Sequence, residues 1–406
     1  MKYIFVLADG MADRPNEIFN GKTPMYVADK PHINRMAAGG ITGLCQTVPP
    51  EFNPGSDVAN LSILGYPPKD YYKGRSSLEA ISAGVPLGEG DLTLRANLVS
   101  VSDEENFDDK TLLDYCGGEV STEDAAKLIA DVQKALDDEV LSIHPSVSFR
   151  NILLWHGGAT DMTFSPAHEI MDHRLGDEYP EGSMADIAIA YMKKAHEILK
   201  EHPYNKAKAK KGELQANALW LWGPGVKAPL PSFKERYGLK GGVISGVDLI
   251  RGIGISAGMD ICYLGSATGG VVTDFRGKGD LAAAYLKGGG DFIFVHVEAP
   301  DESGHQGKPD MKVNAIEKID QELIPPILDA CEAMGEDYRI IVSPDHATPL
   351  ELRTHSREPI PFVMFDSRYH SMENSIIHDE ESAKESGILF PDGKSMLMKF
   401  LDPSYH

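Results

Sequence analysis

The sequence predicts an α/β fold: a parallel sheet with helices on both faces, and an inserted α+β domain that interrupts it. Two observations predict the sheet. Apolar strands run into acidic residues, as in "KYIFVLADG" and "IFVHVEAPDESGH", and stretches of helical periodicity separate such strands. Strands that alternate with helices are typical of a parallel sheet. A third observation, a middle segment of different pattern, predicts the insert.

The strands of the predicted sheet end at three carboxylates. The first strand ends at Asp9, the strand at residues 292–297 precedes Asp301, and "YRIIVSPDHATP" reaches Asp345. Ligands of parallel sheets bind beyond the carboxyl ends of the strands. We therefore expect the three acids at one edge. Helices are predicted between strands, for example over 246–259 and 315–334.

The middle segment predicts a separate domain. Residues 92–118 alternate around an acidic loop, as in a hairpin, and Ser121 with an acid three residues later marks a helix start. A further strand, "RNILLWHGG", and an amphipathic helix, "ADIAIAYMKKAHEILKEH", follow. We predict a discontinuous core domain, 1–73 and 216–406, and an inserted cap domain, 74–215.

Composition restricts the class of partner. The 406 residues carry a formal net charge of −22, which disfavours nucleic acid and anionic membranes. An anionic substrate then needs a local cationic site. No stretch reaches the length of a membrane span, and no signal peptide is predicted. Four scattered cysteines without a C-x-x-C pair fit a reduced cytoplasm. The sequence gives no oligomeric state.

The acidic strand ends also carry histidines. Asp301 and His305 are four residues apart and can hold one metal ion from a helical turn. Asp345 and His346 are adjacent at a strand end and can serve one ion or two, with His355 nearby. Oxygen and imidazole ligands suit Mn²⁺, Zn²⁺ or Mg²⁺. Taken alone, each of these histidines is better explained as a capping or surface residue; three junctions of the same kind favour a metal-binding edge.

A nucleophile is offered by "EFNPGSDVANLSILGY". Pro54 and Gly55 form a turn, and Ser56 stands at or next to the N-cap of the following helix. There the helix dipole favours an alkoxide and then a phosphate, and a bound metal would lower the pKa of the hydroxyl. The alternative for this segment is an ordinary capping serine.

These motifs together resemble a known family. The segments "LADG", "NPGSDVANLSILGY", "PDESGH", "SPDHATP" and "THSREPIP" are similar to the alkaline phosphatase superfamily, and most closely to its cofactor-independent phosphoglycerate mutases in their shorter, archaeal-type branch. The resemblance covers nearly the whole chain, including "GRSSLEAISAGV", "LRANLVSV" and "TDMTFSPAH". It implies an alkaline-phosphatase-like core and two divalent ions, with Mn²⁺ expected and Zn²⁺ or Mg²⁺ as alternatives, and no 2,3-bisphosphoglycerate.

The resemblance also implies ligand sets and a reaction. One ion would be held by Asp9, Ser56, Asp345 and His346, and the other by Asp301, His305 and His355. Ser56 would form a phosphoserine during interconversion of 3-phosphoglycerate and 2-phosphoglycerate, a step of glycolysis and gluconeogenesis.

Substrate-binding residues are expected in the insert. Arg95 and Arg150 stand in otherwise apolar strands, where a charge needs a cleft or a partner. Asp161 and His168 lie in a loop that resembles the family's. Structural roles are the alternative for all four. The alternatives for the whole chain are a metal-dependent phosphatase or other phosphomutase, and a non-catalytic phosphometabolite- or metal-binding protein.

Overall fold

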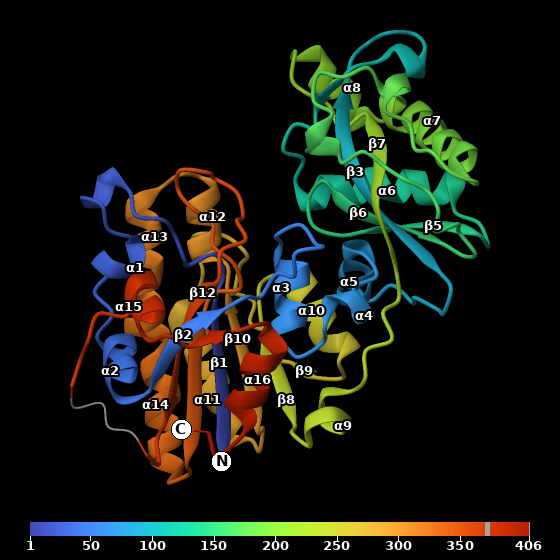
Figure 1. Ribbon diagram of the computed structural model, residues 1–406. Coiled ribbons are helices and arrows are strands. Elements are labelled where there is room, and N and C mark those ends of the chain that lie inside the picture. Colours follow the sequence, from blue (N-terminus) through green and yellow to red (C-terminus); the bar gives the residue numbers. More distant parts are fainter. Residues whose placement is uncertain (370–373, 406) are drawn as a thin grey trace. The chain divides into compact units, whose positions relative to one another are not determined.

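The computed structural model describes residues 1–369 and 374–405 and divides into two compact units. Unit 1 comprises Met1–Tyr72 and Pro229–His406, and unit 2 comprises Lys73–Ala228 (Figure 1). The chain thus returns to unit 1 later than residue 216, where the sequence placed the boundary. The reason is strand β7 (Ala218–Val226), which pairs with β3 (Leu92–Val101) and so belongs to unit 2.

Unit 1 is built on an eight-stranded sheet in the order β13-β2-β12-β11-β1-β10-β8-β9. All its strands run parallel except β12, which is antiparallel to both neighbours. The predicted parallel-sheet core is therefore confirmed, with one reversed strand. The strands are β1 (Lys2–Ala8), β2 (Ile41–Cys45), β8 (Gly241–Ile244), β9 (Asp260–Ile261), β10 (Phe292–Val297), β11 (Tyr338–Ser343), β12 (Ile360–Asp366) and β13 (Leu389–Phe390).

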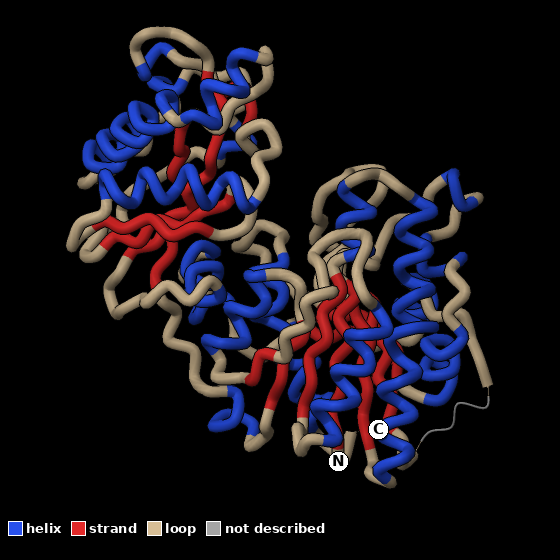
Figure 2. The backbone as a smooth tube through the Cα atoms, turned by 180° about the vertical axis from the view of Figure 1, so that it is seen from behind, coloured by secondary structure: helices blue, strands red, loops and turns tan. Residues whose placement is uncertain are grey.

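Helices cover both faces of the unit 1 sheet (Figure 2). The central strands are buried on both faces, so they read as continuous apolar runs instead of alternating ones. On one face, Ile4 and Val295 pack with residues of α2, α11, α13 and α14; on the other, Phe5 packs against Phe400 of α16. The helices are α1 (Pro24–Val27), α2 (Pro31–Gly39), α3 (Ser56–Ile63), α4 (Pro68–Tyr71), α9 (Phe233–Tyr237), α10 (Asp248–Ser256), α11 (Phe275–Lys287), α12 (Ala299–His305), α13 (Pro309–Lys318), α14 (Ile324–Met334), α15 (Glu380–Glu385) and α16 (Gly393–Leu401), with a 3₁₀ turn, η1 (Glu17–Phe19), and a π-helical turn, η5 (Ile319–Leu323).

Unit 2 has its own antiparallel sheet, in which β3 pairs with β4, β6 and β7, and β6 pairs with β5. Apolar side chains of one sheet face pack against α6 and α7, while α5 packs on the other face through Ala80 against Ile152 and Leu154. The remaining elements are α5 (Arg75–Ser82), β4 (Leu112–Asp114), α6 (Thr122–Leu136), β5 (Leu141–Pro145), β6 (Arg150–Trp155), α7 (Ala185–Glu201) and α8 (Pro203–Lys210), with 3₁₀ turns η2 (Phe107–Asp109), η3 (Ala167–Glu169) and η4 (Leu175–Asp177).

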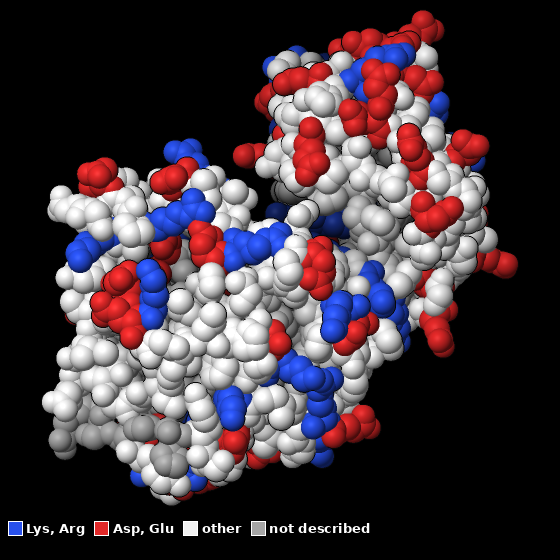
Figure 3. Space-filling model, in the orientation of Figure 1, with Lys and Arg blue, Asp and Glu red and all other residues white. Residues whose placement is uncertain are grey.

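The expected helix start in unit 2 is present, since the Ser121 hydroxyl accepts a hydrogen bond from the Asp124 N–H at 3.1 Å. Acidic side chains are spread over the visible surface of the molecule, in keeping with its net charge (Figure 3). None of the helices in the described residues combines the length and apolarity that a membrane crossing requires.

Candidate metal centre and active site

Three adjacent strands of unit 1 deliver the acidic residues to one edge. The order β11-β1-β10 places the ends of these parallel strands side by side. Asp9 follows β1, Asp345 follows β11, and Asp301 lies in the first turn of α12 just after β10. All three carboxylates are buried. The expectation that the strand ends converge is confirmed by this register.

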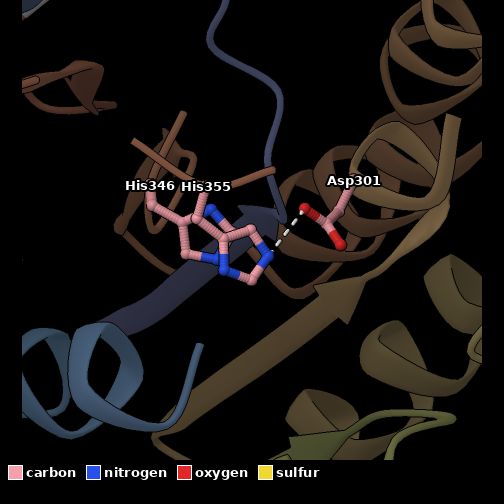
Figure 4. Close-up of side chains that lie close together, drawn as sticks. All are labelled: Asp301, His346 and His355. Carbon is pink, nitrogen blue, oxygen red and sulfur yellow. Dashed lines mark ion pairs between the residues drawn. The ribbon is translucent and has the colours of Figure 1, made fainter. Parts of the chain in front are cut away.

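One group of donors forms around Asp301. Its carboxylate oxygens lie 3.2 Å from His305 Nε2 and 3.5 Å from His355 Nε2 (Figure 4 shows the latter pair). The two histidine Nε2 atoms are 3.0 Å apart. Asp301 and His305 share a face of α12 at the four-residue spacing, and His355 arrives from the loop before β12. Each imidazole also has its Nδ1 near a backbone carbonyl, of Arg353 and Pro54 respectively, which leaves Nε2 for a ligand.

A second group forms around Asp9. His346 Nε2 lies 3.6 Å from an Asp9 carboxylate oxygen and 3.4 Å from Asp345 Oδ2. The Ser56 hydroxyl lies 3.1 Å from His346 Nε2 and 3.4 Å from Asp9 Oδ2. The rings of His346 and His355 are 4.0 Å apart, so the two groups adjoin (Figure 4).

Ser56 is the first residue of α3, and Gly55 occupies the N-cap position. The Ser56 side chain therefore does not cap the helix but points to the Asp9 group. Asn60, one turn further along α3, donates to the Ser56 carbonyl at 2.8 Å and to Asp345 Oδ2 at 2.9 Å. This amide links the start of α3 to the end of β11. Asp345 also accepts the N–H of Gly10 at 3.2 Å, so its orientation is fixed from two sides.

The donor sets fit divalent cations. Asp9 is fully buried, and its Oδ1 has no hydrogen-bond partner among the described residues. Burial raises the pKa of Asp9 well above its ordinary value, and the nearby carboxylates of Asp345, Glu298 and Asp301 raise it further. Carboxylates crowded in this way need positive charge to remain ionised. Oxygen and imidazole donors suit Mn²⁺, Zn²⁺ or Mg²⁺.

The histidines of the two groups differ in their electrostatic setting. The hydrogen bond to Asp301 raises the pKa of His305 to about 9. Burial opposes ionisation of Asp301, but contacts with His305 and His355 outweigh it and hold the Asp301 pKa well below its usual range. Burial lowers the pKa of His346, which keeps this imidazole neutral and able to donate a lone pair.

His296 is a site residue that the sequence did not reveal. It lies inside β10, fully buried, with Nε2 2.9 Å from Asp9 Oδ2 and 3.5 Å from Glu298 Oε2. Its Nδ1 lies 3.2 Å from the Ser245 hydroxyl. Burial lowers the His296 pKa to about 3, so the ring is neutral. In the sequence, the one sign of this role is that His296 interrupts an apolar strand two residues before the acidic turn begins at Glu298.

The structure places the four substrate-binding candidates in unit 2. Arg95 of β3 is buried and forms an ion pair with Glu79 at 3.0 Å, whereas Arg150 is exposed at the start of β6. The His168 ring lies 5.5 Å from the ring of Trp222, which in turn lies under Arg95. Asp161 is hydrogen-bonded to the Ser183 hydroxyl at 2.8 Å. Arg95 and His168 thus share Trp222 as a neighbour; the contacts of Asp161 do not join it to them.

The family model and the curated relatives that match this chain carry the same family description. The family model described as 2,3-bisphosphoglycerate-independent phosphoglycerate mutase matches residues 37–205. A probable 2,3-bisphosphoglycerate-independent phosphoglycerate mutase of Geobacter sulfurreducens is 40% identical over 99% of this chain and 100% of its own. The 2,3-bisphosphoglycerate-independent phosphoglycerate mutase of Methanothrix thermoacetophila is 40% identical over 98% of each chain.

Solved structures agree with the sequence relatives. The PH0037 protein from Pyrococcus horikoshii superposes with a TM-score of 0.83 at 28% identity, over 99% of this chain and 96% of its own. A cofactor-independent phosphoglycerate mutase from Thermoplasma acidophilum gives a TM-score of 0.67 at 25% identity, over 99% and 100%. With relatives of this identity along its full length, the chain belongs to the family of 2,3-bisphosphoglycerate-independent phosphoglycerate mutases.

Proposed function

We propose that this protein interconverts 3- and 2-phosphoglycerate through a phosphoserine on Ser56. The observation that carries the proposal is the Ser56 hydroxyl, which is free of any capping role and lies 3.1 Å from His346 Nε2 and 3.4 Å from Asp9 Oδ2. A hydroxyl so placed can attack a phosphoryl group, provided that its proton is removed and negative charge is offset.

Two divalent ions complete this site in the proposal. Asp9, Ser56, Asp345 and His346 would hold one, and Asp301, His305 and His355 the other. Bound there, the ions would lower the pKa of the Ser56 hydroxyl and stabilise the charge of the transferring phosphoryl group. Mn²⁺ is the proposed identity, with Zn²⁺ and Mg²⁺ as the alternatives that the same donors accept.

The residues of the chain fix the geometry of the attack. Asn60 and the Gly10 N–H orient Asp345, and Ser56 stands at the N-terminal end of α3, where the helix dipole favours negative charge on its oxygen. The His346 imidazole is kept neutral by burial. These groups need little reorganisation when the phosphoserine forms.

The mutase reaction also requires that glycerate stay bound while Ser56 carries the phosphoryl group. We assign this role to unit 2, through Arg95, Arg150, Asp161 and His168. Arg95 is buried on a face of the sheet, and the exposed Arg150 lies opposite Asn97, two residues further along β3. Two guanidinium groups suit a carboxylate better than an apolar ligand. With four free cysteines, the chain suits a reducing compartment, and we propose the cytoplasm.

A metal-dependent phosphatase would use the same serine and ions but release phosphate. The test of the proposal is a coupled assay for 2-phosphoglycerate, run on chelator-treated protein with Mn²⁺, Zn²⁺ or Mg²⁺ added back singly. We expect no product without metal, product with at least one of the ions, and 3-phosphoglycerate-derived phosphate on Ser56 after rapid acid quench. Product formed equally in Ser56→Ala would contradict the proposed intermediate.

A further inference from the structure

Unit 2 contains a largely buried carboxylate where the proposed function needs positive charge. Glu79 of α5 lies with Oε1 2.8 Å from Arg75 Nε and Oε2 3.0 Å from Arg95 Nε. The Glu79 and Arg95 side chains are 12% and 11% exposed, so this ion pair is largely shielded from water. An acid among arginines weakens a simple anion site, and its presence calls for a reason.

Arg95 is held on several sides besides Glu79. Its guanidinium lies 4.3 Å above the ring of Trp222, whose Nε1 donates to Asn97 Oδ1 at 3.1 Å. Gly223 has a φ of +61°, and a Cβ there would stand 3.3 Å from Arg95 Cδ. A side chain at Gly223 would thus crowd the arginine stem. These contacts fix the plane of the guanidinium, which is what bidentate recognition of a carboxylate requires.

Glu79 contacts the inner nitrogen, Nε, of both arginines: it accepts a hydrogen bond from Arg75 and forms an ion pair with Arg95. This geometry leaves the terminal nitrogens of Arg95 at the far side of the guanidinium, and they have no hydrogen bond or ion pair among the described residues. The guanidinium of Arg150, opposite Asn97 in the β3–β6 pairing, lies 4.7 Å from the ring of Phe149 and has no hydrogen bond or ion pair within the same described set. Donor groups of two arginines are therefore available on this sheet face.

The charges of the cluster do not cancel. Arg75, Arg95 and Arg150 all lie close enough to lower the pKa of Glu79; burial opposes its ionisation, but the arginines, Arg95 first, outweigh burial. One carboxylate thus faces three guanidinium groups. The net charge of the cluster is therefore positive, and this face of the sheet is suited to an anion.

We propose that Glu79 is a positioning residue for the substrate's carboxylate: its ion pair at Arg95 Nε holds that guanidinium so that the terminal nitrogens of Arg95 face the ligand. It also cancels one positive charge, which lowers the affinity of the cluster for small anions that would compete. The identity of the ligand rests on the proposed function, because the phosphoryl group is assigned to Ser56 and the carboxylate is the anion that remains.

The inference predicts opposite effects on two measurements. Glu79→Gln keeps the shape of the side chain but removes its charge and releases both arginines. Isothermal titration of chelator-treated protein with inorganic phosphate should show binding at least about threefold tighter than in the wild type, because the cluster gains one net positive charge. For the metal-loaded enzyme, kcat for 2-phosphoglycerate formation should fall about tenfold or more, with KM for 3-phosphoglycerate changed by less than about threefold.

Two further variants distinguish a positioning role of Glu79 from a role in stability alone. Glu79→Asp keeps the charge but is one methylene too short to reach both arginines, so kcat should fall while phosphate affinity stays at the wild-type level. It also provides the test if Glu79→Gln does not fold. Glu123→Gln, an exposed acid on α6 paired with Lys127, is the matched control and should change neither quantity.

Unchanged kcat in both Glu79 variants, or weaker phosphate binding in folded Glu79→Gln, would overturn the inference. A loss of kcat and of phosphate binding in proportion to the folded fraction, followed by circular dichroism, would assign Glu79 a structural role only. If the wild type forms no 2-phosphoglycerate, the proposed function fails separately; phosphate titration of the metal-free protein, with Arg95→Ala as the variant that should lose binding, still tests the arginine cluster.

Discussion

Replacing His296 is expected to weaken metal binding in the ligand group that contains Ser56, although His296 is not itself one of the proposed ligands. His296 Nε2 lies 2.9 Å from Asp9 Oδ2, and both side chains are fully buried. The neutral ring can donate this hydrogen bond because its Nδ1 lies beside the Ser245 hydroxyl, which can supply the complementary proton. The bond turns the Asp9 carboxylate so that Oδ1 faces His346.

The expected magnitude follows from the charge of the acceptor. A hydrogen bond to a charged group contributes about 1.5–3 kcal/mol, equivalent to roughly 10- to 150-fold in an equilibrium constant. Loss of a residue that orients a metal ligand typically costs about 10–100-fold in metal affinity. We therefore expect His296→Ala to weaken one of the two ions by about 10–100-fold and to leave the other, at Asp301, near its wild-type affinity.

The assay is a titration of chelator-treated protein with Mn²⁺, followed by calorimetry and by metal content after gel filtration. His296→Gln, which can still donate from its amide, should recover part of the affinity. His32→Gln is the control, because His32 contacts a carboxylate of Asp320 at 2.9 Å outside both ligand groups. Two ions bound with wild-type affinity in His296→Ala would refute the reasoning, as would equal weakening of both.

Three other perturbations have defined outcomes. Ser56→Ala should abolish both 2-phosphoglycerate formation and acid-stable phosphorylation of the protein, measured with ³²P-labelled substrate, while its melting temperature stays near that of the wild type. His305→Ala should lower metal content from two ions toward one and reduce activity at least about 100-fold, since it removes one of the proposed ligands; full activity would remove the proposed Asp301 ion from the mechanism. Glu380 tests whether the stability of the fold depends on proton binding. Burial raises the pKa of Glu380 to about 7 from an ordinary 4.5. Between pH 4.5 and about 7, the folded state therefore binds a proton that the unfolded state lacks. The free energy of unfolding should therefore fall as pH rises through that window, by up to about 3 kcal/mol, and Glu380→Gln should flatten the urea-denaturation profile over this range.

The sheet edge of unit 1 could be predicted because its pattern is local. Strands β1, β10 and β11 are buried on both faces, so each reads as an apolar run, and the acid after each run marks the point where the sheet ends. Parallel pairing then places Asp9, Asp301 and Asp345 at one edge of the sheet, whereas their close approach depends on the strand order β11-β1-β10, which the sequence does not display.

Other features depend on long-range pairing that the sequence does not display. β7 was expected in the core domain because "ALWLWGPG" reads as a buried strand, but nothing local says that its partner is β3 of unit 2. Alternation alone could not pair Arg95 with Glu79, which lies on a helix.

His296 shows the same limit within the site. A histidine in an apolar strand points to either face of a sheet, and only the tertiary structure shows that its ring meets Asp9. Ser56 was ambiguous for a different reason. A serine near a helix start is ordinarily a cap, and a shift of the helix start by one residue decides whether its hydroxyl caps the helix or is free. Gly55 takes the N-cap, and the hydroxyl is left for chemistry.

The measurement that tests the central claim most directly is the ratio of free phosphate released to 2-phosphoglycerate formed, with 3-phosphoglycerate as the substrate and metal-loaded wild-type protein. A mutase must keep water from the phosphoserine and keep glycerate bound, so the account predicts isomer formation with little phosphate release. Arg95→Ala and His168→Ala should raise the ratio, because glycerate then leaves before it is rephosphorylated. A wild-type protein that releases phosphate and forms no detectable 2-phosphoglycerate would contradict the account and support a phosphatase.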